Sequence, residues 1–74
     1  MEIKIKSRET TKTKDYIIEY LITYNEQTFF IIETTNINKS LKINKRYDIY
    51  DSDFKEITYS EFGKYLKEQF LMEI

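Results

Sequence analysis

The sequence predicts a small α+β protein in which an antiparallel sheet of about four strands is covered by one C-terminal helix. Three observations support this class. Apolar and polar residues alternate near residues 2–8 and 41–51, as on half-buried strands. The densest apolar run, residues 16–35, is rich in β-branched and aromatic residues and is broken by one short polar triplet. Apolar residues near the C-terminus recur at helical spacing. With 74 residues, the chain is expected to form a single domain, 1–74.

The first predicted strand covers residues 2–8. Ile3 and Ile5 fall on one face, and Glu2, Lys4 and Lys6 fall on the other. Charged side chains along an unpaired edge discourage association with other chains. The pattern therefore places this strand at an edge of the sheet.

Two strands at residues 16–24 and 28–35 are expected to form a hairpin around a three-residue loop, Asn25-Glu26-Gln27. This register would place Leu21 and Phe29 on the same face. It would also set Glu19 directly opposite Glu33, which destabilises a sheet, and a loop of another length would separate the two charges. An alternative reading is a helix over residues 15–25, because apolar residues there also recur at i, i+4 spacing. The β-branched and aromatic residues of that window argue against it.

A fourth strand is predicted at residues 41–51, and a short return strand is expected at 55–57. The helix is expected over residues 59–72. Thr58 and Glu61 match a capping box, in which the threonine hydroxyl accepts from the backbone N–H of the glutamate. The apolar stripe that would face the sheet consists of Tyr59, Phe62, Leu66 and Phe70. Gly63 beside this stripe would allow close approach of the backbone.

Composition limits the function. The chain has no cysteine and no histidine, so thiolate catalysis, disulfides and the commonest metal ligands are excluded. No spacing singles out a pair of catalytic carboxylates, and we expect no enzyme activity, no metal and no cofactor. The sequence shows neither a secretion signal nor an apolar run long enough to cross a bilayer, so a cytoplasmic protein without membrane contact is expected.

The net charge of −1 conceals separate charged blocks, and residues 39–46 hold four bases and no acid. Lys42, Lys45 and Arg46, with tyrosines nearby, could bind phosphates and stacked bases. No signature of a common nucleic-acid-binding module accompanies them. A nucleic-acid-binding accessory protein is therefore the alternative interpretation.

The content of seven tyrosines and five phenylalanines exceeds what a small core needs, and tyrosine is enriched at protein interfaces. Tyr65 and Met72 form a second apolar line on the helix, and Leu21 and Phe29 are expected on the far face of the hairpin. These four residues are the predicted partner-binding site. The function that the sequence favours is a small protein-binding module that also forms homo-oligomers, such as a phage-type or mobile-element-type inhibitor of a bacterial machine. A small structural subunit of a larger assembly is a further alternative.

Overall fold

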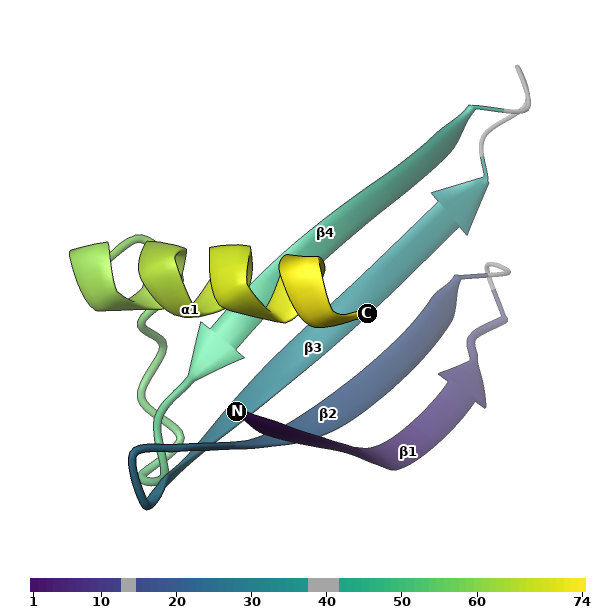
Figure 1. Ribbon diagram of the computed structural model, residues 1–74. Helices are drawn as coiled ribbons and strands as arrows, with labels where there is room; N and C mark the ends of the chain where they lie inside the picture. The colour runs from purple at the N-terminus through teal and green to yellow at the C-terminus, as the bar shows by residue number, and fades with distance from the viewer. Residues whose placement is uncertain (13–14, 38–41) are drawn as a thin grey trace.

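A computed structural model describes residues 1–12, 15–37 and 42–74 of the chain. Four strands form one antiparallel sheet in the order β1-β2-β3-β4, and one helix lies across one of its faces (Figure 1). This arrangement confirms the predicted α+β class. The elements are β1 (Glu2–Thr10), β2 (Tyr16–Tyr24), β3 (Gln27–Ile37), β4 (Ile43–Tyr50) and α1 (Glu61–Glu73).

The turn between β2 and β3 contains two residues and not three. Tyr24 pairs with Gln27, and the two residues between them, Asn25 and Glu26, have φ angles of 49° and 63°. Positive φ at both central positions is the conformation of a type I′ turn, whose twist matches that of antiparallel strands. The predicted three-residue loop is therefore wrong, and the register of the hairpin shifts by one residue.

This register separates the two glutamates that the sequence placed opposite each other. Glu19 pairs with Ile32, and Glu33 pairs with Ile18, so the two carboxylates lie on opposite faces of the sheet. The expected position of Phe29 on the far face is also wrong. Phe29 turns toward the helix, where it is only 5% exposed. A one-residue shift has this effect because side chains alternate between faces along a strand.

We call the sheet face under α1 the helix-side face and the other the far face. The core lies between α1 and the helix-side face. It consists of Tyr20, Ile22, Phe29, Ile31, Ile49, Leu66 and Phe70. Complete burial of an isoleucine, leucine or phenylalanine side chain stabilises a fold by about 1.5–3 kcal/mol. The two fully buried helix residues, Leu66 and Phe70, confirm the C-terminal half of the predicted stripe, whereas Phe62 is 38% exposed.

The helix begins two residues later than predicted. Ser60 is the N-cap, and its hydroxyl accepts from the backbone N–H of Gly63 at 2.9 Å. Thr58 is buried and bonds instead to β4, where its Oγ1 accepts from the N–H of Ile49 at 2.9 Å. The predicted capping box with Thr58 is therefore wrong, because the hydroxyl is already engaged. Tyr59 consequently precedes the helix and is exposed.

The other boundaries differ modestly from expectation. β1 continues to Thr10, past an irregularity between Ile5 and Ser7. The short strand expected at 55–57 is reduced to one isolated bridge between Tyr50 and Glu56. β4 is described from Ile43 onward, and Leu41, the first residue of the predicted strand, lies outside the described residues.

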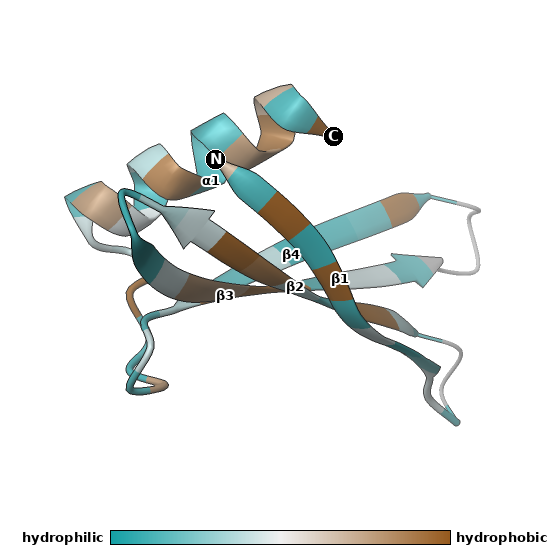
Figure 2. Cartoon of the chain, turned by 60° about the horizontal axis from the view of Figure 1, so that its bottom comes forward, coloured by the Kyte–Doolittle hydropathy of each residue, from teal (hydrophilic) through white to brown (hydrophobic). Residues whose placement is uncertain are grey.

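The helix covers only part of the sheet. The molecule measures 40 × 23 × 22 Å, and the strands run past the helix toward one end (Figures 1 and 2). The 13 residues of α1 span about 20 Å, whereas the 11 residues of β3 span about 36 Å. The ring of Phe70, near the end of α1, contacts Tyr20 and Tyr47 at the limit of the covered region. Beyond these contacts the helix-side face is open.

Candidate functional site

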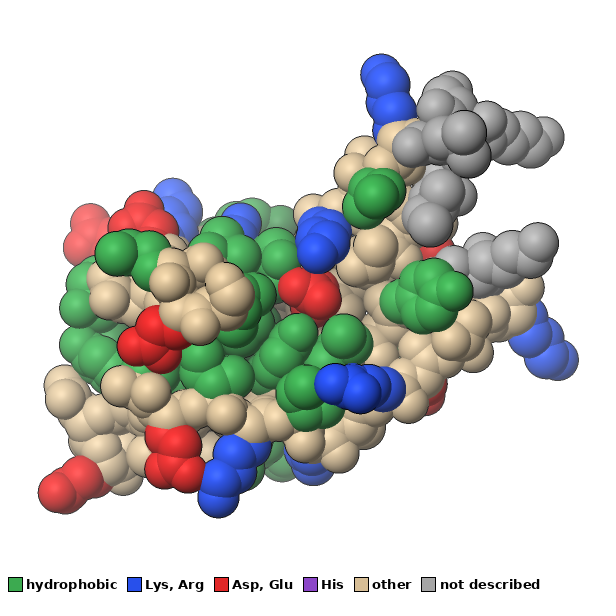
Figure 3. All heavy atoms as spheres, turned by 45° about the vertical axis from the view of Figure 1, so that its right-hand side comes forward, with side chains coloured by type: hydrophobic (Ala, Val, Ile, Leu, Met, Phe, Trp, Pro, Cys, Tyr) green, Lys and Arg blue, Asp and Glu red, His purple; other side chains and the backbone are tan. Residues whose placement is uncertain are grey.

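The open half of the helix-side face forms a hollow of about 750 Å³, which we call the trough. Its helix-side side chains come from all four strands because neighbouring strands pair in register. They are Arg8, Thr10, Tyr16, Ile18, Glu33, Thr35, Ile43 and Lys45. Figure 3 shows a hollowed surface on which an acidic side chain lies between basic and apolar ones. The trough thus combines apolar area with charge.

Apolar side chains remain exposed in the trough. Tyr16 is 52% exposed and Ile43 is 64% exposed, although both belong to strands whose other ends reach the core. Ile18 is partly buried and packs against the core. Exposed apolar groups that line one hollow mark a surface suited to contact with another molecule.

Cations stand on the two rims. Arg8 belongs to β1 and Lys45 to β4, the two edge strands of the sheet. Arg8 pairs with Ile18 of β2, and Lys45 pairs with Thr35 of β3. Each cation therefore lies beside the central strands, and its side chain is exposed. A partner that lies in the trough would meet a positive charge on either side.

Glu33 lies at the floor of the trough and is only 5% exposed. The Tyr47 hydroxyl donates a hydrogen bond to its Oε2 at 2.8 Å. Burial of Tyr47, followed by the hydrogen bond and the charge of Glu33, raises the pKa of Tyr47 to about 12. Burial and the same carboxylate also raise the pKa of Tyr20. Both hydroxyls stay protonated near neutral pH, so Tyr47 remains a hydrogen-bond donor to Glu33 at the floor of the trough.

The structure divides the predicted basic site. Lys45 faces the trough, whereas Arg46, its neighbour in the chain, faces the far side and bonds Asp48 at 3.2 Å. Lys42 is exposed just before β4. Consecutive strand residues point to opposite faces, so Lys45 and Arg46 do not form one patch.

The predicted partner-binding residues also lie in separate places. The Tyr65 hydroxyl accepts a hydrogen bond from that of Tyr24 at 3.3 Å, near the β2–β3 turn. Met72 is 78% exposed near the other end of the helix, whose C-terminus lies toward the trough (Figure 1). Leu21 is half-buried on the far face, and Phe29 is part of the core. None of the four predicted residues lines the trough.

The far face is partly covered by the chain itself. The ring of Phe54, a positive-φ residue of the loop after β4, stacks on Phe30 at 5.0 Å and 14°. The Lys6 ammonium also lies 5.0 Å from the Phe30 ring centre. Leu21 pairs with Phe30 across the strands. The predicted homo-oligomer stays a prediction, and Leu21 marks the surface that would carry it.

Most trough residues were not singled out in the sequence, where Tyr16 and Thr35 were treated only as parts of strands. One signal was present in the sequence. A helix of about 14 residues is shorter than strands of nearly equal residue number, because the rise per residue is 1.5 Å in a helix and about 3.3 Å in a strand. A single helix could not cover one face of the sheet from end to end.

Comparison with known proteins gives no match: no family model, curated protein or solved structure is significantly similar to the chain. Within residues 1–12, 15–37 and 42–74, the structure shows no group of acidic side chains placed to hold a metal ion. In the same residues, no helix could cross a membrane, because the 13-residue α1 is too short and too polar.

Proposed function

We propose that the protein is a non-enzymatic binding module that contacts another protein through the trough and the adjoining C-terminal end of α1. The observation that carries this proposal is the uncovered half of the helix-side face. There, Tyr16 and Ile43 stay exposed beside a hollow of about 750 Å³. A surface that combines exposed apolar side chains with charges at its rim has the organisation of a protein interface.

The end of the helix extends this surface. Leu71, Met72 and Ile74 are exposed large apolar residues in the last turn and at the C-terminus. The flexible methionine side chain adapts its shape to a partner. In this proposal the three residues add apolar contact area to that of the trough.

The chemistry of the side chains supports binding over catalysis. The sequence has no histidine or cysteine to act as an acid, base or nucleophile at neutral pH. The buried carboxylate of Glu33 is engaged by Tyr47, whose raised pKa keeps its proton in place. An inhibitor built this way would act by covering a functional surface of its target. A structural subunit would use the same contacts permanently.

Affinity capture from the native cell tests the proposal when wild type is compared with matched surface variants. The double variant Tyr16→Ser, Ile43→Ser removes exposed apolar area from the trough. Phe54→Ser removes an aromatic ring that is more exposed than either residue and lies outside the trough. We expect wild type and Phe54→Ser to retain the same protein and the double variant to lose it.

Nuclease treatment before capture separates the two candidate functions. A protein partner retained after nuclease treatment supports the proposal. If the retained material is nucleic acid, or if the double variant retains the partner as well as wild type does, the proposal is wrong. Nucleic-acid binding through Lys42, Lys45 and Arg46 would also weaken steeply with salt, because each neutralised phosphate releases counterions.

A further inference from the structure

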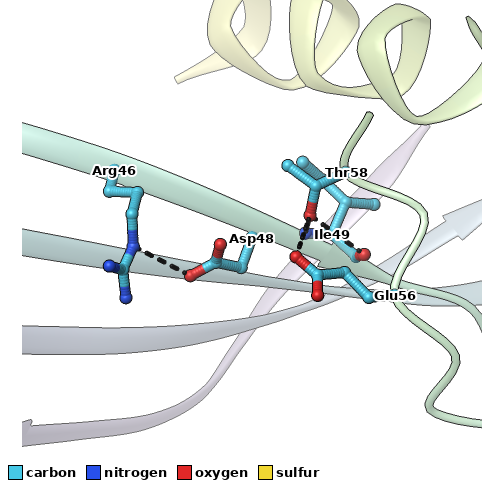
Figure 4. A network of polar contacts seen from close by, with 5 residues as sticks. All are labelled: Arg46, Asp48, Ile49, Glu56 and Thr58. Carbon is cyan, nitrogen blue, oxygen red and sulfur yellow. Dashed lines mark hydrogen bonds and ion pairs between the residues drawn. The ribbon is translucent and has the colours of Figure 1, made fainter. Parts of the chain in front are cut away.

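The outer edge of β4 is closed at one end by the chain itself. Ile49 directs both of its backbone groups outward: its N–H donates to Thr58 Oγ1 at 2.9 Å, and its carbonyl accepts from the Ile57 N–H at 2.7 Å. The Asp51 N–H likewise donates to the Lys55 carbonyl at 3.0 Å. Figure 4 shows Thr58 and Glu56 beside Ile49, with Arg46 and Asp48 further along the strand. The segment Lys55–Thr58 therefore covers the outer edge of the chain from Asp51 back to Ile49.

The rest of the edge is open. In an antiparallel sheet, alternate residues direct both their N–H and their carbonyl to the same side. The backbone groups of Ile49 point toward the outer edge, so the backbone groups of Tyr47, Lys45 and Ile43 point there too. In the described part of the chain, no backbone hydrogen bond outside the sheet and helix reaches these three residues. Figure 1 shows β4 as the outermost strand along this length. Three consecutive outward positions thus offer a donor and an acceptor each, which is the arrangement that strand addition uses.

The helix-side surroundings of this edge are positive. Thr58 lies beyond the outer edge, and it lines a hollow of about 370 Å³ together with helix residues that include Lys64, Lys67 and Glu68. The Lys67 ammonium lies 5.6 Å from the ring centre of Tyr47. With Lys45 in the strand itself, this side carries three lysines against two glutamates, Glu68 and the buried Glu33 opposite Tyr47. A strand that enters here would gain from acidic side chains.

Pairing with a second copy of the chain would oppose like charges. Three antiparallel registers use at least two of the outward residues Ile43, Lys45 and Tyr47. The first sets Lys45 opposite Lys45, although it also sets Lys42 opposite Asp48, and the second sets Arg46 opposite Arg46. The third sets Arg46 opposite Lys42. Like charges directly opposite each other destabilise a sheet, so each register is penalised.

We propose that the open edge of β4 binds an extended acidic segment of a partner protein, which adds as a fifth strand beside Ile43, Lys45 and Tyr47. This inference rests on the proposed function and specifies how the partner is held. Alternate side chains of the added strand would lie on the helix side, between Lys45 and the lysines of α1. The same strand would extend the rim of the trough, so both surfaces would contact one partner.

A backbone variant and a charge variant at one position test this inference. The N–H of Lys45 points away from β3, so Lys45→Pro removes an outward donor without removing a sheet hydrogen bond, and proline is tolerated at such edge positions. Lys45→Thr keeps the donor and removes the charge. The probe is a displayed library of nine-residue peptides with random sequence, selected on wild type and on each variant. Amide hydrogen exchange of the wild-type protein with an enriched peptide shows which N–H groups become protected.

We expect wild type to enrich peptides with acidic residues at alternate positions, and these peptides to slow exchange at the Lys45 and Tyr47 amides. Lys45→Pro should weaken them by about fivefold or more, the effect of one lost backbone hydrogen bond. Lys45→Thr should enrich fewer acidic peptides while keeping the alternating pattern.

Enrichment of basic or helical peptides would overturn the inference, as would equal selection on wild type and Lys45→Pro. Protection of the same amides at high protein concentration without peptide would overturn it in favour of a second copy. If Lys45→Pro still captures the cellular partner at full strength while the trough double variant does not, the edge inference fails and the proposed function stands. If neither variant loses that partner, the proposed function itself is wrong.

Discussion

The Tyr47 hydroxyl donates a hydrogen bond of 2.8 Å to Glu33, the residue directly opposite it in the neighbouring strand. This bond lies where the core ends and the trough begins, since the Tyr47 ring also packs against the core residue Phe70, with ring centres 6.0 Å apart. It allows a carboxylate to stay buried beneath an open surface. The shape of the trough floor depends on this pair.

The pair predicts an alkaline loss of stability. The pKa of Tyr47 is raised from 10 to about 12, so the protonated hydroxyl favours the folded state. Its contribution is complete below pH 10 and is lost as the pH rises toward 12. Urea denaturation at pH 8 to 12 should show a falling free energy of unfolding in that window. Tyr47→Phe should cost about 1–3 kcal/mol at pH 8, because the buried carboxylate loses its donor, and its alkaline fall should be smaller.

The matched control for this prediction is Tyr16→Phe, which removes a hydroxyl from an exposed ring in the same trough. It should change neither the stability at pH 8 nor the alkaline fall. If Tyr47→Phe behaves like Tyr16→Phe, the hydrogen bond does not support the buried charge, and the account of the trough floor is wrong.

Gly63 is predicted to be irreplaceable, even though alanine is a better helix former than glycine by about 1 kcal/mol. A Cβ at this position would lie 1.7 Å from the carbonyl oxygen of Ile57. That oxygen also accepts from the backbone N–H and the hydroxyl of Ser60. Gly63→Ala should therefore lower the free energy of unfolding by about 1–3 kcal/mol or more through overpacking.

Lys64→Ala provides the control, because it changes the next, exposed residue of the helix. Thermal melting should show an unchanged or slightly higher Tm for Lys64→Ala and a clearly lower Tm for Gly63→Ala. Equal melting temperatures for the two variants would show that the backbone approach is not as close as the structure has it.

Tyr65 and Met72 should affect binding more than folding. Met72→Ala should leave the free energy of unfolding within about 0.5 kcal/mol of wild type, because the side chain is largely exposed. Tyr65→Ala should cost somewhat more, because it also breaks the contact with Tyr24. Leu66→Ala removes a fully buried side chain and should cost about 2–5 kcal/mol of stability.

The affinity for a captured partner completes this comparison. An interfacial anchor should cost about 2 kcal/mol or more of binding energy when it is truncated. If Tyr65→Ala and Met72→Ala unfold the protein as much as Leu66→Ala does, these residues belong to the core. If both leave stability and affinity unchanged, they lie outside the interface.

Self-association, if it occurs, should use the far face and not β4. Leu21 is apolar, half-buried and paired with Phe30 in the middle of that face. We expect sedimentation at high micromolar concentration to show an oligomer that Leu21→Glu dissociates and Tyr59→Ser does not. A strictly monomeric wild-type protein at that concentration would refute the predicted homo-oligomer.

The elements of the fold could be predicted because their apolar periods differ. Leu66 and Phe70 at helical spacing, and the alternation around Ile3 and Ile49, lead directly to the helix and the strands. The register could not be predicted, because Asn25 and Glu26 form a two-residue turn without the glycine that usually marks one. Phe29 was assigned to the wrong face of the sheet because the predicted loop was one residue too long.

The helix start was missed for a related reason. Thr58 and Ser60 are both suited to N-capping, and the choice between them depends on a tertiary contact, the bond from Ile49 to Thr58. The candidate site depends on tertiary structure to a greater degree still. Arg8 and Lys45 become its two rims only because the sheet brings β1 and β4 to either side of the same open face.

Site-specific photo-crosslinking in the native cell tests the central claim, that the open half of the helix-side face binds a protein, most directly. A photoreactive phenylalanine analogue would replace Tyr16 or Ile43 in the trough, or Ser52 as an exposed control outside it. We expect one discrete protein adduct from Tyr16 and Ile43, resistant to nuclease, and none from Ser52. Adducts of equal yield from all three positions, or adducts from Ser52 alone, would contradict it.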